Sequence, residues 1–199
     1  SWHARADAAT ALGKLPGKDA PVILIAMLQE IEPGVRLAVT EGANTEVELV
    51  NRRLLWAAVN DPSEMVRSAS FLGLMRSPIA EYKSEGYKGV RNESKAIRLM
   101  LLDAMRAKPS EEQRGALRLA VTDQSSEVRA AALRALSALP EPVVAAEIEN
   151  TFADKDPRVQ MALIELASVK KIALPETALQ NLRSSVSKDV QSRLAELLK

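Results

Sequence analysis

The residues of this chain that could do chemistry are charged side chains repeated at a fixed distance. An arginine recurs at a step of 31 residues, at Arg5, Arg36, Arg67, Arg98 and Arg129. Acidic or amide side chains recur at the same step, at Asp61, Asn92, Asp123 and Asp154. Guanidinium and carboxylate groups form strong charge-assisted hydrogen bonds, so this spacing can build a series of ion pairs. A charge that recurs in every repeat favours bonds between repeats over one ligand site.

Groups for nucleophilic, acid–base or metal chemistry are sparse. Cysteine is absent and His3 is the only histidine, so no His-based triad and no His/Cys metal site can be assembled. Glu111 and Glu112 are adjacent, and neighbours in sequence do not face each other on a helix. A capping role in a first helical turn is therefore favoured for this pair. We expect no catalytic residue, no metal and no cofactor, and a chain that is not itself an enzyme.

The composition narrows the class of partner. The formal net charge is +1, although 27% of the residues are charged. This balance argues against nucleic acid, which needs a basic stripe, and against recruitment to a charged membrane surface. The longest apolar stretch, residues 22–28, is too short to cross a bilayer, and the absence of cysteine leaves the compartment open. The chain opens at Ser1 inside a repeat, and we interpret it as a segment of a longer protein.

The arginine positions belong to a longer pattern that predicts pairs of helices. A small aliphatic marker residue precedes each of these positions, at Ala4, Val35, Val66, Ile97, Val128, Val159 and Val190. Such a period is typical of stacked repeat arrays. Apolar spacing predicts a first helix in each repeat, over 21–29, 45–59, 79–90, 110–121, 142–152 and 176–186. It predicts a second helix over 4–15, 35–43, 66–75, 97–105, 128–139, 159–169 and 190–198.

Two local signals refine these helices. Ser110 and Gln113 have the spacing of a capping box and predict a helix start after Pro109. Gly86 and Gly89 lie inside the predicted helix 79–90, and each glycine costs about 1 kcal/mol relative to alanine in a helix interior. We therefore expect that helix to be short, kinked or mobile.

The motif Asp-x-x-x-x-Val-Arg-x-x-Ala-x-x-Ala-Leu resembles a HEAT repeat, of the compact type seen in bacterial scaffold proteins and bilin-lyase subunits. Residues 123–136 match it most closely, and the pattern covers essentially the whole chain. The resemblance implies an all-α, right-handed α-solenoid, or superhelix, of about six to seven helix-pair repeats in a single domain over residues 1–199. It also implies a structural ladder between neighbouring repeats, formed by Asp61, Arg67, Arg98, Asp123 and Arg129. Gln160 and Gln191 replace arginine and Ser185 replaces aspartate, so the ladder should weaken towards the C-terminus.

A partner surface is expected on the second helices, which line the concave face of HEAT-type arrays. Positions that should be polar there are in part apolar, and the candidate residues are Leu37, Leu72, Leu99, Met100, Arg134 and Met161. The alternative is that these side chains pack between adjacent second helices. Trp56 lies in a stretch that is apolar on nearly all sides, and we interpret it as a buried packing residue. The alternative is a tryptophan that stacks on a base or grips a ligand.

The function indicated is a non-enzymatic scaffold that presents a concave helical surface to a protein or peptide. Two alternatives stay open. One is an accessory module of a larger enzyme, either bilin-lyase-like or redox, although no bilin or haem ligand other than His3 is present. The less favoured one is a nucleic-acid-binding array, in which Arg76, Arg106 and Arg134 would form a basic stripe interrupted by acidic residues.

Overall fold

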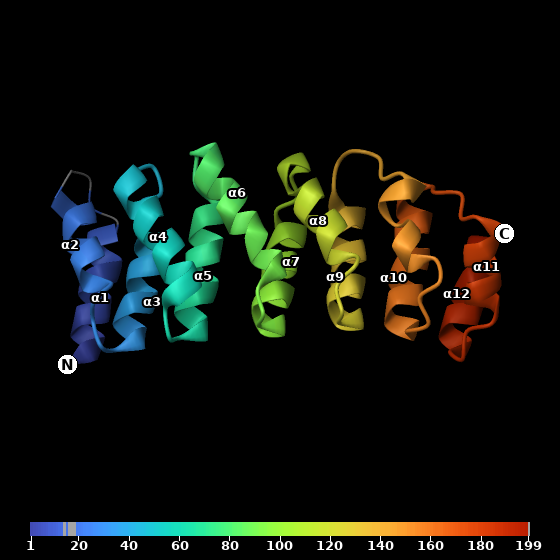
Figure 1. Ribbon diagram of the computed structural model, residues 1–199, viewed down its shortest axis with the longest axis horizontal. Coiled ribbons are helices and arrows are strands. Elements are labelled where there is room, and N and C mark those ends of the chain that lie inside the picture. The colour runs from blue at the N-terminus through green and yellow to red at the C-terminus, as the bar shows by residue number, and fades with distance from the viewer. Residues whose placement is uncertain (14, 16–18, 199) are drawn as a thin grey trace. The chain divides into compact units, whose positions relative to one another are not determined.

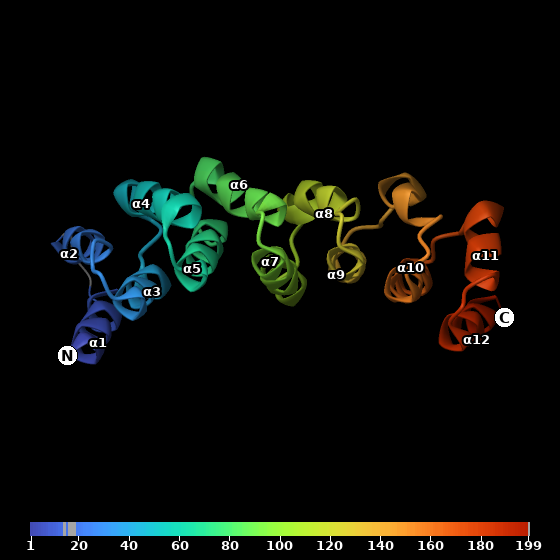
Figure 2. The same cartoon turned by 60° about the horizontal axis from the view of Figure 1, so that its bottom comes forward.

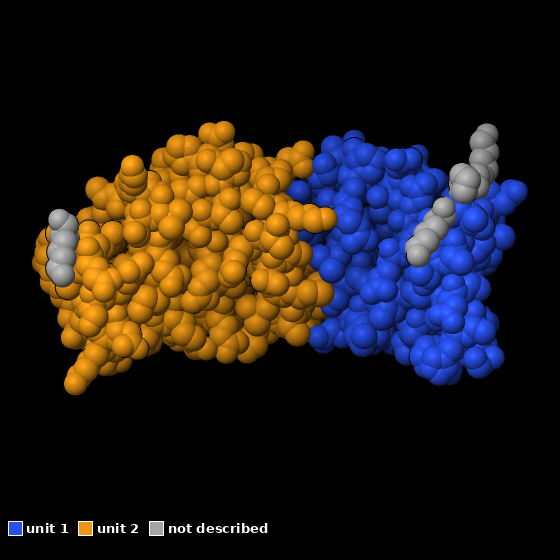
Figure 3. All heavy atoms as spheres, turned by 180° about the vertical axis from the view of Figure 1, so that it is seen from behind, with its two compact units in different colours: residues 1–89 blue, residues 90–199 orange. Residues whose placement is uncertain are grey.

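The computed structural model describes residues 1–13, 15 and 19–198 of the chain. These residues form twelve α-helices, four 3-10 helices and no strand (Figure 1). The all-α repeat of helix pairs predicted from the sequence is confirmed. The chain divides into two compact units, unit 1 over Ser1–Gly89 and unit 2 over Val90–Lys199, and each is described by itself (Figure 3).

Unit 1 consists of two layers of helices. The second-helix layer holds α1 (Trp2–Gly13), α3 (Pro33–Gly42) and α5 (Glu64–Met75). The first-helix layer holds α2 (Asp19–Met27), α4 (Glu48–Asn60) and α6 (Ala80–Lys88), and Figure 2 shows it above the other layer. The markers Val35 and Val66 are fully buried, whereas Ala4, at the same position of α1, is exposed. The predicted helix 4–15 ends beyond α1, and Lys14 within it lies outside the described residues.

Close approach between α5 and α6 explains one of the two glycines of the predicted helix 79–90. A Cβ atom on Gly86 would lie 2.6 Å from the backbone nitrogen of Met75, so only glycine lets the helices come this near. In the structure, the segment predicted as one helix forms α6 followed by the 3-10 helix η1 (Gly89–Arg91). The change of helix type at Gly89 therefore shortens the α-helix, and Gly86 serves packing at its buried face.

Unit 2 repeats the arrangement with a less regular first-helix layer. Its second helices are α7 (Lys95–Ala107), α9 (Ser126–Ala138), α10 (Pro157–Lys170) and α12 (Lys188–Leu197). Its first helices are η2 (Glu111–Gln113) continuing as α8 (Arg114–Ala120), and α11 (Glu176–Arg183). The capping box predicted at Ser110 is confirmed, with Gln113 Oε1 accepting from the Ser110 backbone nitrogen at 3.3 Å.

Second helices of both units begin two residues before the marker. The residue just before them is a serine or aspartate in most repeats, and its side chain caps the helix in α7, α10 and α12 through Ser94, Asp156 and Ser187. Four markers of unit 2, Ile97, Val128, Val159 and Val190, are fully buried. The marker position thus fixes where each helix starts and which of its faces is buried.

The α-helix predicted over residues 142–152 is wrong. This segment forms two short 3-10 helices, η3 (Ala145–Glu147) and η4 (Glu149–Thr151). Pro142 is tolerated at the first position of a helix, so the contacts of this segment with its own and neighbouring side chains decide its form. Apolar spacing alone could not show this, because Val143 and Ile148 are buried in the 3-10 form as well.

Charged groups from neighbouring helices hold this irregular segment in place. Arg114 on α8 pairs with Glu147 at 2.9 Å, and Glu147 also accepts from the Val144 backbone nitrogen at 3.0 Å. Lys170, at the end of α10, donates to the carbonyl oxygens of Leu139 and Glu141. Hydrogen bonds to Glu111 and Glu147 raise the pKa of the Arg114 guanidinium, and the Arg114 bond lowers the pKa of Glu111.

Candidate functional site

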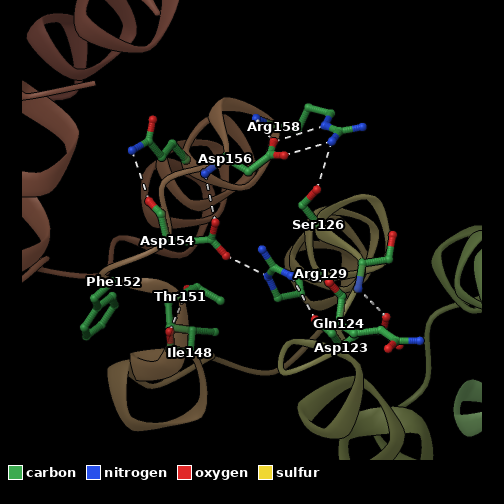
Figure 4. Close-up of polar contacts among 12 residues, drawn as sticks. Asp123, Gln124, Ser126, Arg129, Ile148, Thr151, Phe152, Asp154, Asp156 and Arg158 are labelled. Carbon is green, nitrogen blue, oxygen red and sulfur yellow. Dashed lines mark hydrogen bonds and ion pairs between the residues drawn. The ribbon is translucent and has the colours of Figure 1, made fainter. Parts of the chain in front are cut away.

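The recurrent arginines join the turns of neighbouring repeats. In unit 2, Arg98 donates through Nη1 to the carbonyls of Asn92 and Glu93 at 2.7 and 3.0 Å. Its guanidinium also lies against Asp123, one repeat further on, with Nε 2.8 Å from Oδ2. Arg129 repeats this geometry with the carbonyl of Asp123 and the carboxylate of Asp154 (Figure 4). Each such arginine therefore holds its own turn and the next one.

The same arrangement lies in the interior of unit 1. Arg36 donates to both oxygens of Asp61 at 2.8 and 2.9 Å and to the carbonyls of Glu30 and Ile31. Both side chains are nearly fully buried, and the hydrogen bond to Asp61 raises the pKa of Arg36. Arg67 donates to the carbonyls of Asp61 and Pro62. A buried ion pair is tolerated only when its polar atoms are satisfied, and here they are.

The aspartates that pair with these arginines also accept a hydrogen bond within their own turns. Oδ1 of Asp61, Asp123 and Asp154 accepts from the backbone nitrogen two residues further on, at 2.8 to 3.0 Å. Only a short side chain with an acceptor can make this Asx-turn bond. The carboxylate and the guanidinium are thus occupied by bonds within the chain, which leaves these residues a role in joining repeats.

At the C-terminal end the ion pair is replaced by neutral groups. Ser185 Oγ donates to Gln160 Oε1 at 2.5 Å, and Gln160 Nε2 donates to the Asp154 carbonyl at 3.1 Å. Ser185 Oγ also accepts from the Ser187 backbone nitrogen at 3.3 Å. The positions and bonding pattern of the ladder therefore persist where both charges are lost.

The residues proposed for a partner surface on the second helices are half-buried. This holds for Leu37, Leu72, Leu99, Met100, Arg134 and Met161. Met161 packs against the cluster of Ile164, Leu182, Val190 and Leu194. Arg134 lies 3.5 Å from Glu165 on the next second helix. Packing between second helices thus accounts for much of their surface, and a partner contact there remains a proposal.

The face of α4 that points to solvent carries the large apolar side chains that such a surface needs. Trp56 is 53% exposed and Val59 is 65% exposed, and Leu49 on the same face is also exposed. We call the exposed residues Leu49, Arg52, Arg53, Trp56, Val59 and Asn60 the α4 solvent face. Their spacing of three, four and seven residues places them on one side of the helix.

The interpretation of Trp56 as a buried packing residue is wrong. The buried side of α4 is formed by Leu54, Ala57 and Ala58, and Trp56 lies on the opposite side. The run from Leu54 to Val59 is apolar all round, so periodicity gave no sign of which side faces the core. The two arginines earlier in the same helix were the usable signal, because charged side chains mark the solvent side.

The two arginines of the α4 solvent face differ in their surroundings. Arg52 pairs with Glu48 at 2.7 Å, and hydrogen bonds to Glu48 and then to Tyr82 raise its pKa. Arg53 has no ion-pair partner among the residues that the structure describes. A cation without a partner therefore lies one turn away from the exposed indole of Trp56.

Unit 2 has a groove beside α11, of about 680 Å³. It is lined by Glu149, Phe152, Ala153, Lys155, Thr177, Gln180, Asn181 and Ser184. The buried Asn181 donates to the carbonyls of Phe152 and Asp154, and Lys155 donates to Asn181 Oδ1 at 2.6 Å. Glu149, on η4, and residues of α11 line the groove from two sides of it.

The described part of the chain holds neither a cluster of metal-binding side chains nor a membrane-spanning helix. No group of three or more His, Asp or Glu side chains there could hold a metal ion. No helix in that part is long and apolar enough to cross a membrane.

Comparison with known proteins gives likeness to solved structures alone. No family model and no curated protein matches the chain. One similar structure is a designed armadillo repeat protein in complex with the peptide (KR)4, with 15% identity, a TM-score of 0.39, and 97% of this chain and 90% of that chain covered. A computationally designed armadillo repeat protein for modular peptide recognition has 17% identity and a TM-score of 0.41 over 99% and 90% of the two chains. At these values the likeness carries no argument about what this chain binds.

Proposed function

We propose that this chain is a non-enzymatic scaffold of the HEAT type that binds a protein or peptide partner. Its repeated charged residues are occupied in joining one repeat to the next, which suits a stacked framework better than a reactive site. The observation that carries the proposal is the α4 solvent face, where Leu49, Trp56 and Val59 are exposed on one ordered helix. Tryptophan and arginine are over-represented among the residues that dominate binding energy at protein interfaces.

The exposed area of Trp56 is large enough to contribute to the free energy of binding. A buried tryptophan removes 150–250 Å² from water, so a half-exposed one leaves roughly 100 Å² for a partner to cover. At about 25 cal/mol per Å², covering Trp56 alone stabilises a complex by roughly 2–3 kcal/mol before the cost of association. We place the first contact on α4 rather than on the second helices, because Leu37, Leu72, Leu99, Met100 and Met161 are half-buried.

A nucleic-acid partner is not proposed, because Lys95, Arg134 and Arg158 on the second helices of unit 2 are paired with acids. Lys95 and Arg158 both contact Glu127, at 2.5 and 2.9 Å, and Arg158 also pairs with Asp156. A gel-shift assay at low salt checks this point. We expect no retarded species with duplex or single-stranded DNA, and a salt-sensitive shift would overturn it.

The proposal is tested by capture of binding proteins on the immobilised chain, quantified by mass spectrometry. The double variant Trp56→Gln, Val59→Arg places polar groups on α4, and Gln180→Ala, in the same register on α11, is its matched control. We expect a defined set of proteins to bind the wild-type chain and the control and to be lost with the double variant. Equal capture by all three chains would remove α4 as the binding surface.

A further inference from the structure

The exposed helix face described above also indicates the chemistry of what binds it. We propose that the α4 solvent face binds a helical segment of a partner protein that places apolar side chains on Leu49, Trp56 and Val59 and a carboxylate on Arg53. This inference rests on the proposed scaffold function and adds the class of partner to it.

The partner segment is a helix because α4 offers side chains and no backbone groups. The backbone of Glu48–Asn60 is hydrogen-bonded within its own helix, and no strand edge is present in the described part of unit 1. A segment docking on this surface must therefore satisfy its own backbone, as a helix does. Leu49 and Val59 are about 15 Å apart along the axis at 1.5 Å per residue, so the partner needs about three helical turns.

The partner segment needs a carboxylate because Arg53 has no ion-pair partner within the described residues. A segment that covers Trp56 removes water from Arg53, which lies one turn away on the same face. Removing water from an unpaired charge is costly, and a facing carboxylate offsets that cost whereas a facing lysine adds repulsion. The nearest acid on α4, Glu48, is held by Arg52 at 2.7 Å and does not supply the pair.

Neighbouring helices of the same layer do not supply the missing acid either. The solvent side of α2 presents Val22 and Ile23. On α6, Glu85 is paired with Lys88 at 2.5 Å. Glu81, also on α6, is exposed, and no ion pair joins it to Arg53 among the residues that the structure describes.

A second copy of this chain fits the surface poorly. Two α4 helices packed antiparallel around a twofold axis near Leu54, so that Leu49 meets Val59, would bring the two Arg53 side chains to the same side of the interface. Isologous packing repeats every charge, so an unpaired cation would face its own copy. An acidic partner of different sequence avoids this repulsion.

The experiment uses the full chain with Trp2→Phe, so that Trp56 is the sole tryptophan. Two capped 15-residue helical peptides serve as probes, both with leucines at heptad a and d positions, one flanked by glutamates and the other by lysines. We expect the glutamate peptide to shift the Trp56 emission to the blue and to bind at least about tenfold tighter than the lysine peptide, with a preference that shrinks as salt rises.

Charge reversal makes the test specific to Arg53. Arg53→Glu should invert the peptide preference, whereas Arg118→Glu, the same charge change on the exposed side of α8 in unit 2, should leave it unchanged. Failure of both peptides to bind, equal binding of both, or an unchanged ratio in Arg53→Glu would each overturn the inference. So would dimerisation of the wild-type chain through α4, measured by light scattering at the same concentration.

The two proposals fail in different ways. One outcome would refute the acidic helix and leave the scaffold function standing. In it, proteins bind the wild-type chain, are lost with Trp56→Gln, Val59→Arg, and bind Arg53→Glu as well as they bind the wild-type chain. Capture that is indifferent to all of these variants would refute both.

Discussion

Helices α4 and α11 occupy the same register of the repeat, four repeat steps apart, and differ in almost everything that faces solvent. Their buried sides correspond, with Leu54, Ala57 and Ala58 on α4 against Ala178, Asn181 and Leu182 on α11. On the solvent side, α4 has Arg53, Trp56 and Val59 where α11 has Thr177, Gln180 and Arg183. The repeat therefore determines only the residues on the buried side of these helices. The exposed Trp56 differs from the polar residue at this position in α11, and packing of the core does not require it.

The ends of the two helices differ in a second way. Asp61 follows α4 and forms an ion pair with Arg36, whereas Ser185, after α11, forms a neutral hydrogen bond with Gln160. Both bonds join residues that are 25 positions apart. The fold therefore has a bond at this place in both repeats, and the bond is charged in one repeat and neutral in the other.

Removing these two bonds should have the largest and most unequal effect. Asp61→Ala leaves the buried Arg36 guanidinium without its partner, and we expect a loss of about 3–5 kcal/mol of local stability. Ser185→Ala should cost about 1 kcal/mol, because it removes a neutral bond. Hydrogen exchange of α3 and α4, and of α10 and α11, measures each loss separately. Equal losses in the two variants would mean that charge contributes nothing at the buried position.

Glycines in the helices that lie between α4 and α11 in the sequence offer a second contrast. Gly86→Ala forces a Cβ atom to within 2.6 Å of the Met75 backbone, and we expect a loss of about 1–3 kcal/mol. Gly115→Ala on α8 meets no atom within 4 Å and should stabilise that helix by about 0.5–1 kcal/mol. Thermal unfolding of both variants gives the signs, and a stabilised Gly86→Ala would contradict the close approach of α5 and α6.

Acid should weaken the charge network of unit 2. Hydrogen bonds from Arg158 lower the pKa of Asp156, and bonds from Lys95 lower the pKa of Glu127. Because these carboxyls take up protons more readily when unfolded, their contribution is complete above the unfolded values near 4 and is lost as the pH falls through the folded values. Hydrogen exchange in α9 and α10 between pH 5 and pH 2.5 should show this loss. Glu127→Gln should reduce the pH dependence, and an unchanged profile would contradict its cause.

Exchanging the solvent sides should have the smallest effect on stability and the clearest effect on binding. Trp56→Gln, Val59→Arg gives α4 the residues of α11, and we expect a change within about 0.5 kcal/mol, as for exposed positions in general. A loss above about 2 kcal/mol in urea unfolding would show that Trp56 supports the fold.

Much of this fold could be predicted from the 31-residue step, because the marker residues fix both the start and the buried side of each second helix. The segment 142–152 could not, since its valines and isoleucine fit an amphipathic helix, whereas contacts with Arg114 and Lys170 accompany the 3-10 form. The candidate site was missed at Trp56 for a related reason. In an all-apolar run the core can lie on either side, and the packing of neighbouring helices decides which.

The bonds between turns also bear on how the chain folds. Each of them closes a loop of the same short length, with partners 25 residues apart in the pairs of Arg36, Arg98, Arg129 and Gln160. Loop closure at this length costs little conformational entropy, and contacts between near neighbours in sequence are associated with fast folding. Helices can therefore be added one repeat at a time to whichever part orders first, and at these four positions a side chain is available to bind the next turn.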